Sequence, residues 1–207
     1  MKEYLSVVGE TVSEKTIEKS RFLTYVSHAV GEEEAKAYLT KVRSLHPLAT
    51  HVCYGYIADN IGTLQRFSDD GEPQGTAGMP ILNVLKSQGL YECVVAVVRY
   101  FGGIKLGAGG LTRAYAGCAA EGVASAEKRK YTMCAEVSLG VDYADVNAAL
   151  RFLEKEEVLS RDFGEKAVFV VAVEEERLAQ FCAAVLDCFN GKADISEGKR
   201  YYYPFPN

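Results

Sequence analysis

Several features common in membrane, secreted and metal-binding proteins are missing from this sequence of 207 residues. No stretch approaches the roughly 18 consecutive apolar residues of a membrane-spanning helix, and residues 1–6 lack the long apolar run of a secretory signal. No two of the six cysteines have C-x-x-C spacing, and His28, His46 and His51 do not supply the closely spaced ligands of a structural zinc site. Most cysteines lie in apolar runs, which predicts buried, reduced thiols. We therefore expect a cytoplasmic protein without a membrane partner, metal or other cofactor.

The net charge of −5 is unevenly divided along the chain. Residues 1–130 carry 15 Lys and Arg against 14 Asp and Glu, a balance of +1, whereas residues 131–207 carry 8 against 14, a balance of −6. Neither balance gives the whole molecule an attraction to nucleic acid. Any binding of an anion must therefore be local.

Residues 131–207 alternate between strand and helix patterns. β-Branched and alternating residues predict strands over 131–139, 158–163, 167–173 and around 201–203. Apolar residues at helical spacing predict helices over 146–153 and 178–189. The order strand-helix-strand-strand-helix-strand predicts a ferredoxin-like domain.

The first part of the chain, residues 1–130, predicts a second α+β domain. Strands are expected over 21–30, 51–58, 63–67 and 93–98, and helices over 32–45, from Pro80 to Leu85, and over 111–126. The charged run 127–130 marks the predicted boundary, so the fold class is α+β with domains 1–130 and 131–207.

A glycine-rich segment, 99–113, lies between the strongest predicted strand and a helix. Glycines before a helix let the backbone approach an anion, and the unpaired N–H groups of the helix attract negative charge. From residue 93 to residue 120 there are three cations and no acid. The predicted ligand is phosphate or the RNA backbone, bound by Arg99, Gly102, Gly103, Lys105, Gly107, Gly109, Gly110 and Arg113.

Nucleotide-binding signatures do not fit this segment. It contains no G-x-x-x-x-G-K-[ST], and Gly107-Ala108-Gly109 is followed by Thr112 where a dinucleotide fingerprint needs Gly or Ala. A Walker-type hydrolase or a Rossmann enzyme is therefore not expected. The alternative is structural, since glycines also permit tight packing of a helix on a sheet.

The loop 68–78 carries three acids, Asp69, Asp70 and Glu72, which could form an accessory acidic site. Their oxygens suit Mg²⁺ or Ca²⁺, but the spacing is not that of an EF-hand, and capping or pairing with arginines is the commoner use. His51 and Cys53 share one strand face, as a nucleophilic pair would, yet nothing in the sequence activates them. No catalytic residue is predicted.

Both segments resemble a known family. The motifs SDDGEP at 68–73, GTAG at 75–78 and RYFGGIKLGAGGL at 99–111 closely resemble those of the IMPACT family, specifically its bacterial YigZ-like branch, and the resemblance covers essentially the whole chain. It implies a ribosomal protein S5 domain 2-like first domain, similar to domain IV of elongation factor G, and a second domain similar to domain V of that factor. Eukaryotic IMPACT restrains the kinase pathway that stops translation initiation in amino-acid starvation, an activity that also involves an extra N-terminal domain without a counterpart in this sequence.

Three functions are compatible with these features. The first is a non-enzymatic, translation-associated binding protein that engages RNA or the ribosome through the glycine-rich segment. The second is an enzyme acting on a phosphorylated or small polar substrate in a cleft between loop 68–78 and segment 99–113. The third is an adaptor that binds a protein partner in translation control through the acidic second domain and Tyr201, Tyr202 and Tyr203. We expect the first.

Overall fold

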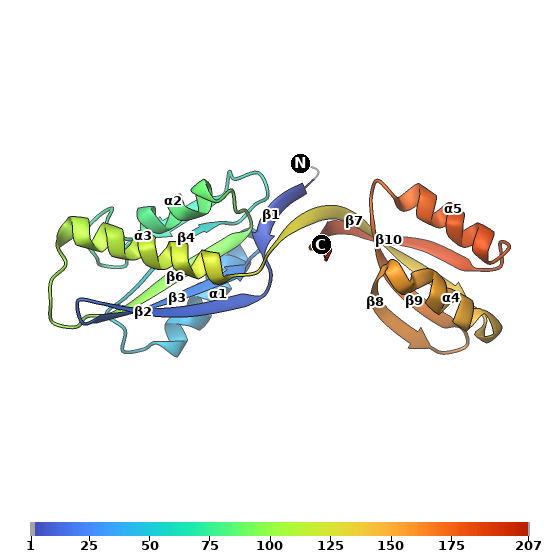
Figure 1. The fold of residues 1–207 in the computed structure, drawn as a ribbon, viewed down its shortest axis with the longest axis horizontal. Helices are drawn as coiled ribbons and strands as arrows, with labels where there is room; N and C mark the ends of the chain where they lie inside the picture. Colours follow the sequence, from blue (N-terminus) through green and yellow to red (C-terminus); the bar gives the residue numbers. More distant parts are fainter. Residues whose placement is uncertain (1–2, 207) are drawn as a thin grey trace. The chain divides into compact units, whose positions relative to one another are not determined.

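The computed structural model describes residues 3–206, which form two compact units (Figure 1). One unit spans Glu3–Lys130 and the other begins at Tyr131. Residues 1, 2 and 207, at the outer ends of the two predicted domain ranges, lie outside the described residues. Each unit is built on an antiparallel sheet with helices packed against it, so the protein belongs to the α+β class.

The first unit contains a sheet in which every neighbouring pair of strands is antiparallel. Its strands follow the order β2 (Glu10–Ile17), β3 (Ser20–His28), β6 (Cys93–Tyr100), β4 (His51–Ile57) and β5 (Gln65–Ser68). Strand β1 (Glu3–Val7) is not part of this sheet and pairs with β7 (Lys128–Val141). Strands β1 and β2 were not predicted from the sequence, whereas the other four are confirmed to within a few residues.

Helices cover both faces of this sheet. Helices α2 (Gly78–Ser87) and α3 (Gly107–Ser125) pack on one face, in a core that includes Val95 and Val97 of β6. Helix α1 (Gly31–Leu45) packs on the opposite face, where Ala96 and Val98 lie. Strand β6 is therefore covered on both sides, which explains its unbroken apolar run.

Helix α3 begins earlier than the sequence predicts. Its first residue is Gly107, with φ of 68°, rather than Leu111. Glycine is a poor helix former, so the sequence pattern indicates a loop where the structure continues the helix. Gly109 and Gly110 consequently lie in the first turn of α3, and the N–H groups of that turn replace the predicted loop as the candidate site.

The second unit has the predicted strand-helix-strand-strand-helix-strand order. Strand β7 pairs with β9 (Ala167–Glu174) and β10 (Asp194–Tyr203), and β9 also pairs with β8 (Glu157–Phe163). Helices α4 (Val146–Phe152) and α5 (Leu178–Cys188) pack on one face of the sheet around Phe169 and Val185, with short 3₁₀ turns at Tyr143–Asp145 and Leu153–Lys155. The predicted tyrosine strand starts seven residues earlier than expected, at Asp194, and Tyr201 to Tyr203 are half-buried.

Two general expectations can be compared with the structure. Four cysteines are buried and free, as predicted, but Cys182 is only half-buried and Cys188 is exposed. Among residues 3–206, no helix has the length and apolar character needed to cross a membrane.

Candidate anion-binding site

Asp69 closes the N-terminus of α2. Its Oδ1 accepts hydrogen bonds from the amides of Ala77 (3.0 Å) and Gly78 (2.8 Å), and its Oδ2 accepts one from Gly75 (2.8 Å). These amides would otherwise lack acceptors at the start of the helix. Burial alone would raise the pKa of Asp69, but the three amide hydrogen bonds outweigh burial and hold that pKa below its ordinary value of 3.8. Asp69 therefore acts as a charged cap.

Asp70 ties the same loop to β4 and α1. Its Oδ2 accepts a hydrogen bond from the amide of Val52 (2.7 Å), and both of its oxygens face the guanidinium of Arg43 at 3.0 and 3.2 Å. The His51 Nδ1 lies 2.8 Å from the carbonyl oxygen of Asp70, and the Cys53 thiol donates to the carbonyl of Asp69. His51 and Cys53 do share a face, but both bind the loop backbone.

Glu72 is buried and forms the centre of a polar network. Its Oε1 lies 2.6 Å from Nη1 of Arg99 and accepts a hydrogen bond of 2.7 Å from the hydroxyl of Tyr115 on α3. Nη2 of Arg99 donates to Oγ of Ser20 at 3.2 Å. Burial raises the pKa of Tyr115, which keeps its hydroxyl protonated as the donor to Glu72.

This network corrects one predicted site residue. Arg99 is only 4% exposed and is paired with Glu72, so the prediction of Arg99 as a surface cation is wrong. A guanidinium this deeply buried needs a carboxylate partner, and the acidic loop supplies one.

The predicted accessory acidic site is also internal. The carboxylate of Asp69 accepts from backbone amides, that of Asp70 binds an amide and Arg43, and that of Glu72 binds Arg99. This is the alternative of capping and pairing with arginines that the sequence left open. Within the described part of the chain, no group of three or more His, Cys, Asp or Glu side chains is arranged to hold a metal ion. Burial raises the pKa of Cys53 to about 12, so its thiol is not a nucleophile at neutral pH.

The glycines of segment 99–113 have different roles. The amide of Gly102 donates to Oγ of Ser20 at 3.3 Å, and a Cβ at Gly102 would clash with the backbone carbonyl of Lys19. Gly102 therefore allows close packing against the backbone of Lys19 and Ser20, which is the structural role that the sequence left open for these glycines. Gly103, with φ of 87°, and Gly107 hold left-handed conformations that favour glycine and turn the chain from β6 into α3.

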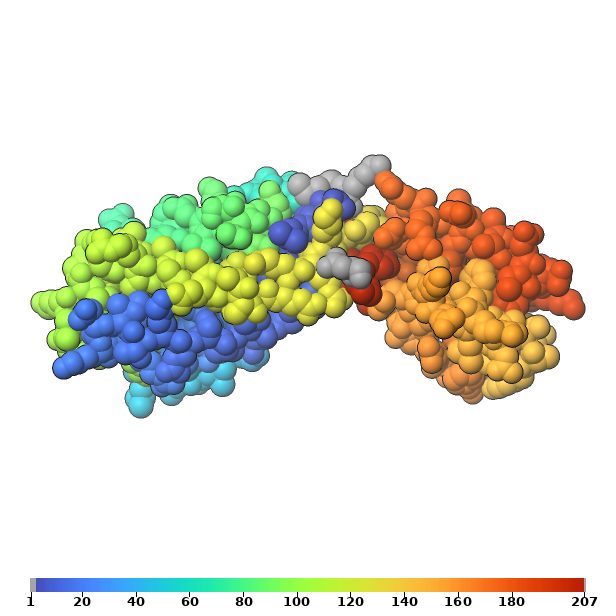
Figure 2. Space-filling model, viewed as in Figure 1, coloured from blue at the N-terminus to red at the C-terminus, as the bar shows by residue number. Residues whose placement is uncertain are grey.

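The first turn of α3 remains open. No side chain caps it at Leu106, its first turn contains no acid, and the described residues give its amides no acceptor outside the helix. Arg113 lies one turn further along, with Nη1 3.6 Å from where a Cβ of Gly109 would be. Figure 2 shows α3, in yellow-green, uncovered on one face of the first unit between α2 and the β2–β3 hairpin.

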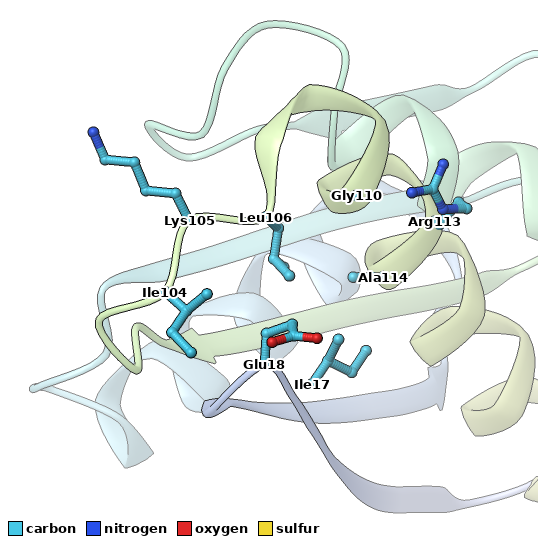
Figure 3. Close-up of a pocket in the computed structure, with 8 residues that line it drawn as sticks. All are labelled: Ile17, Glu18, Ile104, Lys105, Leu106, Gly110, Arg113 and Ala114. Atoms are coloured by element: carbon cyan, nitrogen blue, oxygen red, sulfur yellow. The ribbon is translucent and has the colours of Figure 1, made fainter.

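A pocket of about 550 Å³ borders this turn (Figure 3). In the close-up, Leu106 and Ile104 point toward the centre, Lys105 extends away from it, and Arg113 lies on the other side of Leu106. The carboxylate of Glu18 also faces the pocket. The two cations thus do not converge on one point. The lining residues are Ile17, Glu18, Ile104, Lys105, Leu106, Gly110, Arg113 and Ala114.

Comparison with known proteins places the chain in a family. The model of the Impact N-terminal domain matches residues 18–123, and a relative from Bacillus subtilis, the IMPACT family member YvyE, is 36% identical over 96% of this chain and 93% of its own. The chain belongs to the IMPACT family. A domain of unknown function, DUF1949, matches residues 139–192 of this IMPACT protein.

Further relatives of this IMPACT protein match over nearly the full length. The family member YigZ of Escherichia coli is 34% identical over 94% of this chain and 98% of its own. A solved structure described as that of a hypothetical protein has 33% identity and a TM-score of 0.65, covering 94% of this chain and 97% of its own. The chain is therefore similar to the bacterial YigZ and YvyE proteins in both units.

The buried network yields a prediction about stability. Glu72→Gln keeps the side-chain size but leaves Arg99 buried without a counter-charge, and we expect a loss of about 3–5 kcal/mol in the free energy of unfolding in urea. Glu14→Gln is the matched control, because Glu14 forms a similar but exposed pair with Arg21 and should lose much less. Equal losses in the two variants would contradict a structural role for the buried pair.

The cap of α2 yields a second prediction. Asp69→Ala should lower the free energy of unfolding at neutral pH by about 1–2 kcal/mol, because three amides lose their acceptor. The pKa of Asp69 is depressed in the folded state, so its contribution is complete above the ordinary value of 3.8 and fades as pH falls through the folded pKa. Unfolding curves of wild type and variant should converge at acid pH. Asp187→Ala, at an exposed position on α5, should show no such difference; a constant difference at all pH values for Asp69→Ala would rule out the charged cap.

Proposed function

We infer that this IMPACT protein is a non-enzymatic binding protein that takes the phosphate backbone of RNA, free or in the ribosome, at the first turn of α3. The observation that carries this inference is the contrast between two helix N-termini in one unit: Asp69 closes α2, whereas α3 is left open. Free N–H groups at a helix start favour an anion. The absence of acids from residue 93 to residue 120 adds to this preference.

Two cations adjoin the open turn. Lys105 and Arg113 are both exposed, and the described residues provide neither with an ion-pair partner. Their placement on different sides of the pocket suits a chain of phosphates better than a single phosphate group, which a converging pair would clamp. The carboxylate of Glu18 also faces the pocket and would repel a phosphate inside it. We therefore expect the RNA backbone to lie over the rim of the pocket.

The same geometry does not favour the enzyme alternative. A substrate between loop 68–78 and segment 99–113 would meet no free acid or base of that loop, because Asp69, Asp70 and Glu72 are engaged internally. Binding through backbone amides and exposed cations needs no such group.

The translation context comes from the family. We take the first unit to be of the ribosomal protein S5 domain 2-like class and the second to be ferredoxin-like, similar to domains IV and V of elongation factor G. The pairing of β7 with both β9 and β10 agrees with a ferredoxin-like sheet. A role at the ribosome would place the protein in the cytoplasm. It would also be compatible with binding a protein partner in translation control.

Ribosome co-sedimentation at graded salt tests the proposed function. Lys105→Glu combined with Arg113→Glu should weaken ribosome binding and lower the slope of log affinity against log salt by about one for each lost phosphate contact.

The control for this experiment is Lys86→Glu with Lys192→Glu, which makes the same change in net charge at exposed positions that belong to neither α3 nor segment 99–113. Circular dichroism shows whether each variant is folded. Unchanged affinity in the Lys105 and Arg113 variant, or an equal loss in the control, would contradict the proposed site.

A further inference from the structure

A second cavity shares Lys105 and Leu106 with the first and is lined in addition by Pro73 and by the start of α3. Its volume is about 330 Å³, within the range of small-molecule sites. Three of its walls are apolar: the ring of Phe101, Pro73 and Leu111. The lining therefore offers an aromatic and apolar surface on which the ring of a nucleobase could stack.

Phe101 provides a stacking surface in this cavity. It follows β6 directly and remains 47% exposed, although it is a large apolar side chain. The guanidinium carbon of Arg99 lies 5.5 Å from the ring centroid of Phe101 and 5.5 Å from that of Phe22. The buried cation of Arg99, which is held by Glu72, thus packs on the Phe101 ring, and exposed aromatic rings bind unstacked bases.

The other end of the cavity attracts negative charge. The lining includes Gly107 and Ala108, whose amides belong to the uncapped first turn of α3, and Lys105 at the rim. Arg99 also lines the cavity; its side chain is 5% exposed, and its Nε has no hydrogen-bond partner among the described residues. The carboxylate of Glu72, which lines the cavity too, is already bound by Arg99 and Tyr115.

We propose that this cavity binds one unpaired nucleotide of an RNA strand, with the base on Phe101 and the phosphate at the first turn of α3. This site rests on the proposed function, since the phosphate is taken by the same helix end. A base within a duplex is stacked on both faces and cannot lie on Phe101, so the cavity distinguishes single strands from duplexes.

Fluorescence anisotropy with a labelled oligouridylate of about 12 nucleotides, a length that single-stranded sites can span, tests the proposal. Phe101→Ala should weaken binding about tenfold or more, the loss typical of removing one aromatic platform, whereas Phe101→Tyr keeps the ring and should bind like wild type. Phe67→Ala is the matched control, because Phe67 is 43% exposed on β5 and does not line the cavity; it should bind like wild type. A duplex RNA of the same length should bind wild type and Phe101→Ala equally.

The outcomes separate this proposal from the proposed function. Normal oligouridylate binding by Phe101→Ala, together with loss in the Lys105 and Arg113 variant, would overturn the nucleotide cavity and leave the backbone site standing. No RNA binding by wild type would overturn both. Displacement of the oligouridylate by uridine monophosphate at similar concentrations would overturn the RNA strand as the ligand and assign the cavity to a free mononucleotide.

Discussion

The buried pair of Glu72 and Arg99 is the interaction on which the first unit depends. It joins the acidic loop to β6, and its two further hydrogen bonds reach Tyr115 on α3 and Ser20 on β3. Removing two charges from water is costly, and here the cost is offset by their mutual attraction and by the hydrogen bonds that Glu72 accepts from Tyr115 and Arg99 donates to Ser20. The pair fixes the end of β6 and the body of α3, and with them the glycine turn that connects the two.

The acidic loop therefore stabilises the fold, and the glycine-rich segment provides the candidate binding surface. The acids hold the scaffold: Asp69 closes one helix, Asp70 binds β4 and α1, and Glu72 neutralises a buried arginine. The glycine-rich segment leaves the start of α3 uncapped beside two exposed cations. A net charge of −5 is compatible with a local anion site of this kind, because backbone amides contribute without changing the net charge.

Sequence patterns predicted the elements that bury a clear apolar face. Strand β6 and helix α5 are examples, since an unbroken β-branched run and a 3.6-residue repeat each indicate one structure. Strand β2 was missed because its residues are mostly polar and exposed, so its sequence lacks the alternation of apolar and polar residues that indicates a strand. The start of α3 was missed because its glycines resemble a loop.

The site was predictable only in part. The cations Lys105 and Arg113 follow from composition and from their position near the start of a helix, whereas residues 107–110 were predicted as a loop and form the first turn of α3. The burial of Arg99 does not, because its partner Glu72 is 27 residues away and only the fold brings the two together. Ser20, Tyr115 and Arg43 were missed for the same reason, although pairing of the loop acids with arginines was one of the alternatives.

Phosphate is expected to bind at the open start of α3 and not at the start of α2, which Asp69 closes. Amide chemical shifts in ¹H–¹⁵N spectra, recorded while a short RNA strand is added, test this expectation most directly. We expect the amide signals of residues 107–110 to move and those of Gly75, Ala77 and Gly78, which donate to Asp69, to stay in place. Shifts of equal size in both groups, or shifts confined to the second unit, would contradict it.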